Sequence, residues 1–389
     1  QDDLLMGDII GNLNLSAFKL DYNFNNEDFG TFSTGVKVSN VKNDNDLFYT
    51  NLIDDEIVIN EALTNHFIYK ENIQAAYLDW KKQIDKWSLQ VGLRAENTQV
   101  EGNQLLSGDN FEQNYLQWFP TAFIQYQKDD NNTFGFNTGR RINRPNYGQL
   151  NPFRFFVDIN TFRSGNPRLQ PEKTWNFEFS YNYKSFLDLA LSYSTTKDNI
   201  LFVIQQNDET RTTNVLPVNI GLYNYFGLNI STQIKFWSWW NNRMNVELFY
   251  NEFLGDVAQY DLNNKAFAFR INGNSSLKFT NNFTGEISYF YQPKYQYGIS
   301  DFNPRWRIDL ALQQKILKGD GRIRLAVTDI FYKHSPTGAT NFGNINETFE
   351  SLRDTRVVTI GFQYNFGNSN LKSTKKETDA AKEELQRIG

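Results

Sequence analysis

Residues 139–183 read GRRINRPNYGQLNPFRFFVDINTFRSGNPRLQPEKTWNFEFSYNY, and this stretch decides the fold of the chain. From about Lys173 onward its residues alternate strictly between aromatic and polar. Such alternation predicts a β-strand whose two faces meet different environments. An earlier strand is expected to end near Arg141, so that residues 142–172 connect the two strands. One face of the later strand carries Phe177, Phe179, Tyr181 and Tyr183, and the other carries Asn176, Glu178, Ser180 and Asn182.

The connection 142–172 is predicted to have a definite shape. Each proline in it fixes its own φ and pushes the preceding residue toward an extended conformation. Long connections are usually either functional or disordered, and the aromatic content of this one argues against disorder. The four proline pairs are Arg144-Pro145, Asn151-Pro152, Asn166-Pro167 and Gln170-Pro171.

The composition narrows the class of protein. The 389 residues include 16% aromatic and 21% charged residues. No apolar run is long enough for a transmembrane helix, whereas the strands of a membrane barrel give a weak hydropathy signal because only one face of each is apolar. The net charge of −5 gives no support to nucleic-acid binding, and the absence of cysteine excludes disulfides and thiolate metal sites. No cofactor is expected.

The whole chain is predicted to be all-β, with about fifteen long antiparallel strands joined by alternately short and long connections. Short turns at one end and long loops at the other are typical of an outer-membrane β-barrel. The long connections are expected near 50–65, 101–115, 142–172, 207–214, 256–265, 298–303 and 335–352. The strands are expected near 12–24, 31–49, 66–84, 87–100, 116–127, 133–141, 173–184, 186–206, 215–237, 243–255, 266–279, 283–297, 304–316, 322–334 and 353–366.

The two faces of these strands suit two solvents. In 87–94, apolar residues from Trp87 to Leu93 alternate with Ser88, Gln90 and Arg94. One face therefore suits hydrocarbon, and the other suits water or a polar plug. Tryptophans near both ends of the strands resemble the interfacial aromatic girdles of membrane barrels, although ordinary cross-strand aromatic packing would give the same pattern. They are Trp87, Trp239 and Trp240 at the short-turn ends and Trp118, Trp175 and Trp306 at the long-loop ends.

The strand count indicates a partial barrel. The first and last predicted strands run in the same direction, so their number is odd, whereas single-chain bacterial barrels have even numbers. An open edge in lipid would also leave backbone groups unpaired. Further strands are therefore expected upstream. Residues 1–366 are expected to form the C-terminal portion of the barrel. Residues 367–389 are expected to be a polar periplasmic tail, in which 374–388 forms a charged helix or is disordered.

Several motifs resemble one known family. They are RRINRP at 140–145, LNPF at 150–153 and GNPRLQPE at 165–172, followed by Glu178. The chain resembles the C-terminal β-barrel of a TonB-dependent outer-membrane receptor, in the outer membrane protein beta-barrel family of Bacteroidetes-type envelopes. The resemblance implies a structural role for Pro145, Asn151, Pro152, Gly165, Asn166, Pro167, Leu169, Pro171, Glu172 and Glu178.

The resemblance also implies a fold and an activity. The family fold is a barrel of about 22 strands around an N-terminal plug, and the plug is absent from this sequence. The implied function is a receptor and transporter in the outer membrane of a Gram-negative cell, which binds a scarce solute at long extracellular loops for energised import. The implied partners are outer-membrane lipid and lipopolysaccharide, the plug domain, the TonB complex acting through the plug, and an unknown small solute.

Two other classes of function stand beside the receptor. A passive porin or scaffold barrel would have the same strands without TonB coupling. An enzyme would need a nucleophile, a base and an orienting group within reach of one another, and no catalytic motif surrounds His66 or His334. We therefore predict that the chain is not an enzyme. The acidic run 54–56 lacks the spacing of a calcium loop, so no metal site is expected.

Six arginines are concentrated in and around the long connection, with few acids nearby. They could hold an anionic ligand or lipopolysaccharide phosphates, because guanidinium groups match such oxygens. Alternatively, they could pair with carboxylates of the plug or of neighbouring loops. Alternation places the first two on opposite faces of their strand. The six are Arg140, Arg141, Arg144, Arg154, Arg163 and Arg168.

Overall fold

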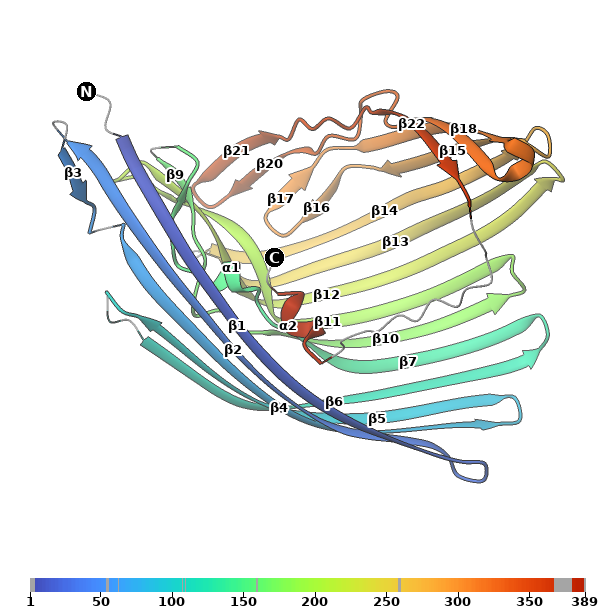
Figure 1. Cartoon of the computed structure of the whole chain (residues 1–389), viewed down its shortest axis with the longest axis horizontal. Coiled ribbons are helices and arrows are strands. Elements are labelled where there is room, and N and C mark those ends of the chain that lie inside the picture. Colours follow the sequence, from blue (N-terminus) through green and yellow to red (C-terminus); the bar gives the residue numbers. More distant parts are fainter. Residues whose placement is uncertain are drawn as a thin grey trace.

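The computed structural model of the protein describes residues 4–53, 56–61, 63–106, 108, 110–158, 160–257, 260–366 and 380–387. Eighteen strands of these residues form one sheet. Three of the eighteen are short pieces, and the other fifteen follow one another as a curved wall (Figure 1). The strands of the wall are β1 (Leu4–Asn26), β2 (Gly30–Ile53), β4 (Asn65–Ile84), β5 (Trp87–Gln104), β6 (Asn110–Asp129), β7 (Asn132–Asn143), β10 (Glu172–Tyr183), β11 (Leu187–Asn207), β12 (Thr212–Trp237), β13 (Trp240–Val257), β14 (Tyr260–Lys278), β15 (Phe283–Gln292), β18 (Arg305–Ile316), β19 (Gly321–Val327) and β22 (Val358–Tyr364).

The remaining elements lie beside or inside this wall. The short pieces of the main sheet are β3 (Glu56–Ile59), β8 (Phe155–Phe156) and β9 (Thr161–Arg163). A second sheet contains β16 (Tyr295–Tyr297), β17 (Ser300–Phe302), β20 (Thr337–Phe342) and β21 (Ile345–Glu350). The helices are α1 (Tyr147–Leu150), α2 (Lys382–Leu385) and a 3₁₀ turn at Leu317–Gly319. Among the described residues, no helix is long and apolar enough to cross a membrane.

The wall confirms the predicted all-β fold and its strand number. Consecutive strands pair in antiparallel fashion in sequence order, with short turns at one end and long connections at the other (Figure 1). Three of the expected long connections, 101–115, 207–214 and 256–265, are wrong. Strand β5 runs to Gln104 and β6 begins at Asn110, and β11 runs to Asn207, which pairs with Thr212 at the start of β12. Strand β13 runs to Val257 and β14 begins at Tyr260, because the two strands stay paired to their tips instead of separating at residues 256–265. Strands β1 and β22 are the two edges of the wall, which is open in the described structure.

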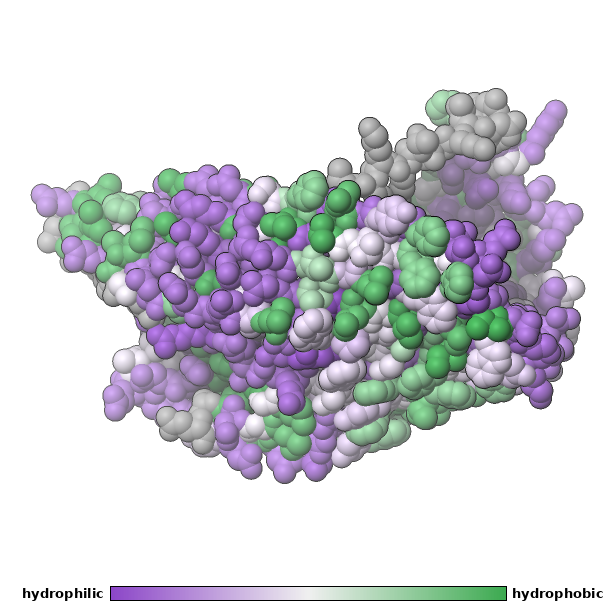
Figure 2. Space-filling view, turned by 90° about the horizontal axis from the view of Figure 1, so that it is seen from below, coloured by the Kyte–Doolittle hydropathy of each residue, from purple (hydrophilic) through white to green (hydrophobic). Residues whose placement is uncertain are grey.

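The outer face of the wall carries an apolar band at its short-turn end. Leu191, Val91 and Ile360 point outward and are 59%, 48% and 78% exposed. Figure 2 shows this band over the half of the molecule near the short turns, with hydrophilic residues beyond it on the long-loop half. A strand needs about 9–11 residues to cross a bilayer, whereas β12 has 26 residues. The strands therefore cross a membrane near their short turns and continue well beyond it.

The concave side of the long-loop half holds two apolar cores. The first lies under the connection after β7 and includes Val41, Phe67, Leu150, Phe153 and Leu169. The second lies where the small sheet packs on β11–β14 and includes Val203, Ile220, Phe253, Val257 and Ile299. Alternating strands explain both, because every second residue of the wall faces inward and meets a connection that folds back into the lumen.

Residues 380–387, which belong to the predicted polar tail, lie against the wall. Helix α2 lies on the concave side of the wall, next to α1 (Figure 1). Its Glu384 is 1% exposed and pairs with Lys37 of β2. Charge, rather than an apolar face, holds this segment in place. The rest of the predicted tail, residues 367–379, 388 and 389, lies outside the described residues.

Candidate functional site: an inward-folded loop and a buried charge cluster

The connection between β7 and β10 folds into the lumen, and we call its residues 144–171 the inner loop. It begins with a capped helical turn. The Asn146 side chain accepts a hydrogen bond from Gln149 N, and the Gln149 side chain accepts one from Asn146 N. This reciprocal cap satisfies donors that a short helix would otherwise leave free. It turns Tyr147 and Leu150 inward, where both are buried.

Two motifs of the inner loop bind each other through their backbones. Gly165 N donates to Asn151 O at 2.8 Å, and Asn166 N donates to Gln149 O at 2.6 Å. A Cβ on Gly165 would lie 2.3 Å from Asn151 O, which is closer than any side chain tolerates. Glycine is therefore required at this close approach of two backbone segments.

The far side of the inner loop is anchored to the wall. Strand β9 pairs with β12 in parallel, so that Thr161 lies opposite Thr213. The Glu172 carboxylate accepts hydrogen bonds from Ile200 N at 2.7 Å and from the amides of Asn199 and Asn143, both at 2.6 Å. Glu172 thereby joins β7, β10 and β11 where the loop re-enters the sheet.

The other residues of the predicted motif also have structural contacts. Pro145 and Leu169 are buried, and Asn166 Nδ2 donates to Pro217 O at 3.3 Å. Glu178 Oε1 accepts from Asn137 Nδ2 at 2.9 Å, across the β7–β10 pair. Pro145, Pro167, Leu169 and Pro171 line a small cavity above the charged residues of the wall. These contacts fix the loop in one shape.

A cluster of buried charges lies beneath the inner loop. Arg144 Nη2 is 2.8 Å from Glu96 Oε2 and 2.9 Å from Thr98 Oγ1. Arg94 Nε is 2.5 Å from Glu96 Oε1, so both oxygens of this carboxylate are paired. The Arg144 and Glu96 side chains are 10% and 6% exposed. Burial alone would lower the pKa of Arg144, but the surrounding acidic groups, Glu96 foremost, together outweigh burial and the pKa is raised.

Glu71 of β4 forms the second half of the cluster. Its Oε1 is 2.5 Å from Arg387 Nη1, and its Oε2 accepts from the Tyr69 hydroxyl at 2.8 Å. The guanidinium of Arg387 also stacks over the Tyr147 ring at 4.7 Å. Burial raises the pKa of Tyr147 to about 12, so its hydroxyl keeps its proton at physiological pH. We call Glu71, Arg94, Glu96, Arg144 and Arg387 the charge cluster.

The six predicted arginines do not gather at one site. Only Arg144 enters the charge cluster. Arg140 shares the outer face with Trp175 and donates to Gln117 Oε1 at 2.8 Å, whereas Arg141 lies opposite Thr174 on the inner face, as alternation predicts. Arg154 stacks over the Phe162 ring at 4.8 Å. Arg141, Arg154, Arg163 and Arg168 are exposed.

Among the residues that the structure describes, the two histidines lie apart from the charge cluster. His66 Nε2 is 2.7 Å from Asp44 Oδ1, and His334 packs edge-on against Phe290. In the part of the chain that the structure describes, no three histidine, aspartate or glutamate residues are placed to hold a metal ion.

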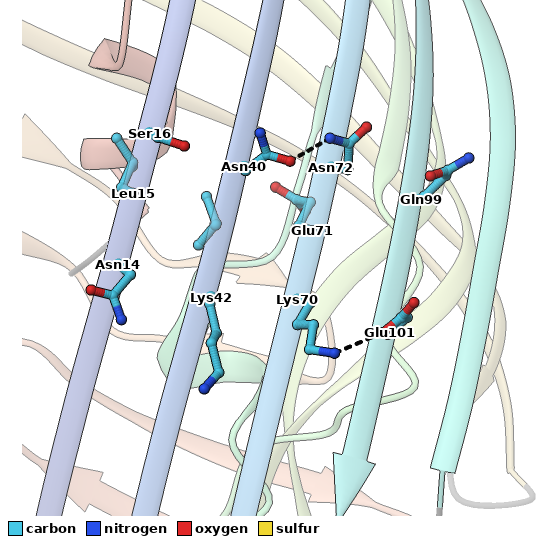
Figure 3. Close-up of a pocket in the computed structure, with 11 residues that line it drawn as sticks. Asn14, Leu15, Ser16, Asn40, Lys42, Lys70, Glu71, Asn72, Gln99 and Glu101 are labelled. Atoms are coloured by element: carbon cyan, nitrogen blue, oxygen red, sulfur yellow. Dashed lines mark hydrogen bonds and ion pairs between the residues drawn. The ribbon is translucent and has the colours of Figure 1, made fainter.

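Two hollows lie elsewhere on the wall. A hollow of about 690 Å³ on the inner face is lined by Arg243, Arg270 and Arg307 among polar residues. A hollow of about 450 Å³ on the outer face lies between β1, β2, β4 and β5 (Figure 3). In it Lys70 Nζ is 3.2 Å from Glu101 Oε2. Along β1, this second hollow begins about ten residues from the short turn after that strand. A strand crosses a bilayer in about 9–11 residues, so the hollow lies where the hydrocarbon of a bilayer would end.

Sequence reasoning missed Lys37, Glu71, Glu96 and Arg387. A signal was present for the first three, because each is a charged residue in the inward phase of an alternating strand. Charged groups are buried only when they are paired. The inward position of these three residues therefore indicated that each has a partner, but it did not indicate which residue the partner is. Arg387 lies in the polar tail, where no alternation indicates which way a side chain points.

The comparisons with known proteins agree with this architecture. Residues 2–364 match the model of the outer membrane protein beta-barrel family. The ferric yersiniabactin uptake receptor FyuA from Yersinia pestis superimposes with a TM-score of 0.62 at 16% identity, covering 93% of this chain and 56% of the receptor. The copper transporter OprC gives a TM-score of 0.65 at 11% identity, with 92% and 58% covered. The siderophore receptor PiuA from Acinetobacter baumannii gives 0.62 at 14% identity, with 92% and 56% covered.

These findings define an outer-membrane β-barrel. The chain belongs to the outer membrane protein beta-barrel family. No curated protein sequence matches it. The structural neighbours share its fold at low identity, and the chain spans a little over half of the length of the three named above. The expected resemblance to TonB-dependent receptors is confirmed at the level of the fold.

Proposed function

We propose that this chain is the C-terminal part of the wall of a TonB-dependent receptor, which binds a scarce solute at its extracellular loops and imports it with energy from the TonB complex. The observation that supports this most directly is the inner loop with its core and charge cluster. Connections that fold back into the lumen and are held there by buried contacts narrow the lumen that the wall encloses. A gated importer needs such a narrowed lumen.

The complete receptor contains more than these residues. The unpaired outer edges of β1 and β22 would leave backbone groups without partners in lipid, at several kcal/mol for each group. Further strands that join these edges would close the barrel, and a plug domain would occupy the lumen against the inward polar face. Residues 4–366 then form the wall, and TonB acts through the plug.

The exposed arginines of the long-loop half supply contacts for an anionic solute. Arg141 and Arg163 are exposed there, and Arg154 is held by its ring contact with Phe162. Arg144 instead has a structural role, since Glu96 already neutralises it. The polar hollow of Figure 3, with Lys42 and Lys70 among its lining residues, lies where lipopolysaccharide head groups would meet the wall.

Solute-limited growth tests this proposal. Cells that carry the full gene are compared with cells that lack it, with one nutrient at a time made limiting: iron as a siderophore complex, an oligosaccharide, a peptide or a vitamin. We expect growth on one of these to require the gene and to fail equally when the TonB complex is removed. Gene-dependent growth that persists without the TonB complex would instead identify a passive porin.

A further inference from the structure

The C-terminal segment 380–387 sits on the inner wall through three ion pairs, two to a lysine of the wall and one, of opposite polarity, to a glutamate of the wall. Glu384 and Glu383 approach Lys37 Nζ of β2, with shortest distances of 3.0 and 2.8 Å. Arg387 approaches Glu71 of β4 at 2.5 Å. We propose that the lumen wall around Lys37 and Glu71 is a docking site for the C-terminal segment of this same chain, and that the docked segment fastens the inner loop.

Burial makes this docking specific. The Lys37, Glu71 and Glu384 side chains are 5%, 1% and 1% exposed, and Arg387 is 12% exposed. A buried charge without a partner is strongly unfavourable. Without the segment, Lys37 loses both glutamates, and among the described residues Glu71 keeps only the Tyr69 hydroxyl as a hydrogen-bond donor. The wall therefore favours a segment that presents an acid and, three residues later, a base.

The segment also contacts the inner loop through its backbone. Tyr147 N donates to Arg387 O at 3.1 Å, and Arg387 Nε donates to Pro145 O at 3.0 Å. One guanidinium thus joins β4 of the wall to the first turn of the inner loop. Undocking would remove these contacts together with the ring stacking on Tyr147. The C-terminal segment and the inner loop are therefore expected to loosen together.

This inference does not depend on the imported solute or on TonB coupling. A zero-length carbodiimide, applied to the full-length protein in outer-membrane vesicles, tests it directly. This reagent joins an amine to a carboxylate only when they are in contact. Glu383 is 67% exposed, so the reagent can reach it. We expect mass spectrometry to find Lys37 joined to Glu383 or Glu384.

The outer-face pair Lys70 and Glu101, 3.2 Å apart and about half exposed, is the internal control. If Lys70 is joined to Glu101 but Lys37 is not joined to the segment in the same sample, the docking proposal is overturned. This holds whether the site is then empty or occupied by another segment.

Charge variants provide the second test. Glu71→Gln removes the partner of Arg387, and we expect trypsin cleavage after Lys382 and within the inner loop to rise by about tenfold or more, because local opening becomes easier. Glu101→Gln on the outer face is the matched control and should leave both rates unchanged. Lys37→Glu should likewise release the segment, and adding Glu384→Lys should restore protection of the inner loop, where it is measured because the second substitution adds a trypsin site to the segment itself. Unchanged cleavage in Glu71→Gln, or no restoration in the double variant, would contradict the proposal.

Discussion

The two halves of the wall hold their shape by different means. Near the short turns the strands alternate simply, with large apolar side chains such as Leu191 and Ile360 pointing outward and polar ones inward. Near the long loops the inward face is covered by the inner loop, the small sheet β16–β17–β20–β21 and helix α2. The shape of the short-turn half depends on the two solvents that its faces meet. The shape of the long-loop half depends on contacts within the chain.

This difference explains where buried charge is found. In the short-turn half, inward polar groups face an open lumen and need no particular partner. In the long-loop half, the inner loop removes water from Glu71 and Glu96, and each then has a partner at a defined distance. The four predictions below test this contrast between the two halves, from the largest expected effect to the smallest.

Arg144→Gln should have the largest effect. It leaves Glu96 buried with Arg94 as its remaining cationic partner, and breaking a buried ion pair destabilises by about 3–5 kcal/mol. The change in the free energy of unfolding is measured by urea titration in detergent micelles. The loss of the heat-modifiable band on gels reports the unfolded fraction. Arg163→Gln, which changes an exposed arginine of the same loop, is the control. Equal stability of the two variants would show that the charge cluster does not hold the inner loop.

Leu191→Arg places a charge in the apolar band. A charge on the lipid face near the bilayer midplane destabilises a barrel by about 2–4 kcal/mol. The same urea measurement in lipid bilayers should show this loss, and micelles should show less of it. Ala190→Arg, on the adjacent inward position of β11, is expected to be tolerated. A reversed order of the two variants would mean that the faces of β11 have been assigned wrongly.

Gly165→Ala should loosen the inner loop without affecting the wall. The new methyl group would meet Asn151 O at 2.3 Å, and such overpacking destabilises by about 1–3 kcal/mol. Limited proteolysis between residues 144 and 171 should accelerate. Gly361→Ala is the matched control, because a Cβ there meets no atom within 4 Å. Equal rates of proteolysis in the two variants would show that glycine is not required at position 165.

Tyr147→Phe should have the smallest effect at neutral pH. Within the described residues the buried Tyr147 hydroxyl has no hydrogen-bond partner, so its removal is expected to change stability by less than about 1 kcal/mol. The effect should appear at high pH. The pKa of Tyr147 is about 12 in the folded chain and near 10 when unfolded.

Between these two pH values the unfolded chain releases a proton that the folded chain keeps. Stability should therefore fall as pH rises from about 10 toward 12. The phenylalanine variant should lose less stability over this range than the parent protein. If the parent protein and the variant lose stability identically over this pH range, the Tyr147 hydroxyl is exposed to water in the folded chain.

Much of the wall could be predicted from the sequence. The strands around Phe177 and Leu191 follow from alternation, because a strand between lipid and water must carry one apolar and one polar face. The motif glycine and prolines likewise indicated a shaped loop. The direction of the loop could not be predicted, since a cap at Asn146 and a close approach at Gly165 are equally compatible with a loop that projects outward.

The candidate site was predicted only in part. Arg144 was named among six arginines, yet the others lie on different faces or remain exposed. Their grouping in sequence carried no information about distance in space, because successive loop residues point in different directions.

The sequence by itself determined the strands of this protein, their number, which face of each is apolar, and at which end of the wall the short turns lie. Each of these depends on local periodicity and on the two solvents that the wall meets. The tertiary structure alone decided which inward charges meet. Glu71 and Arg387 are separated by 316 positions, and no local pattern links residues so far apart. Their contact exists because the wall curves, the inner loop folds back into it, and a buried carboxylate requires a cation wherever the chain can supply one.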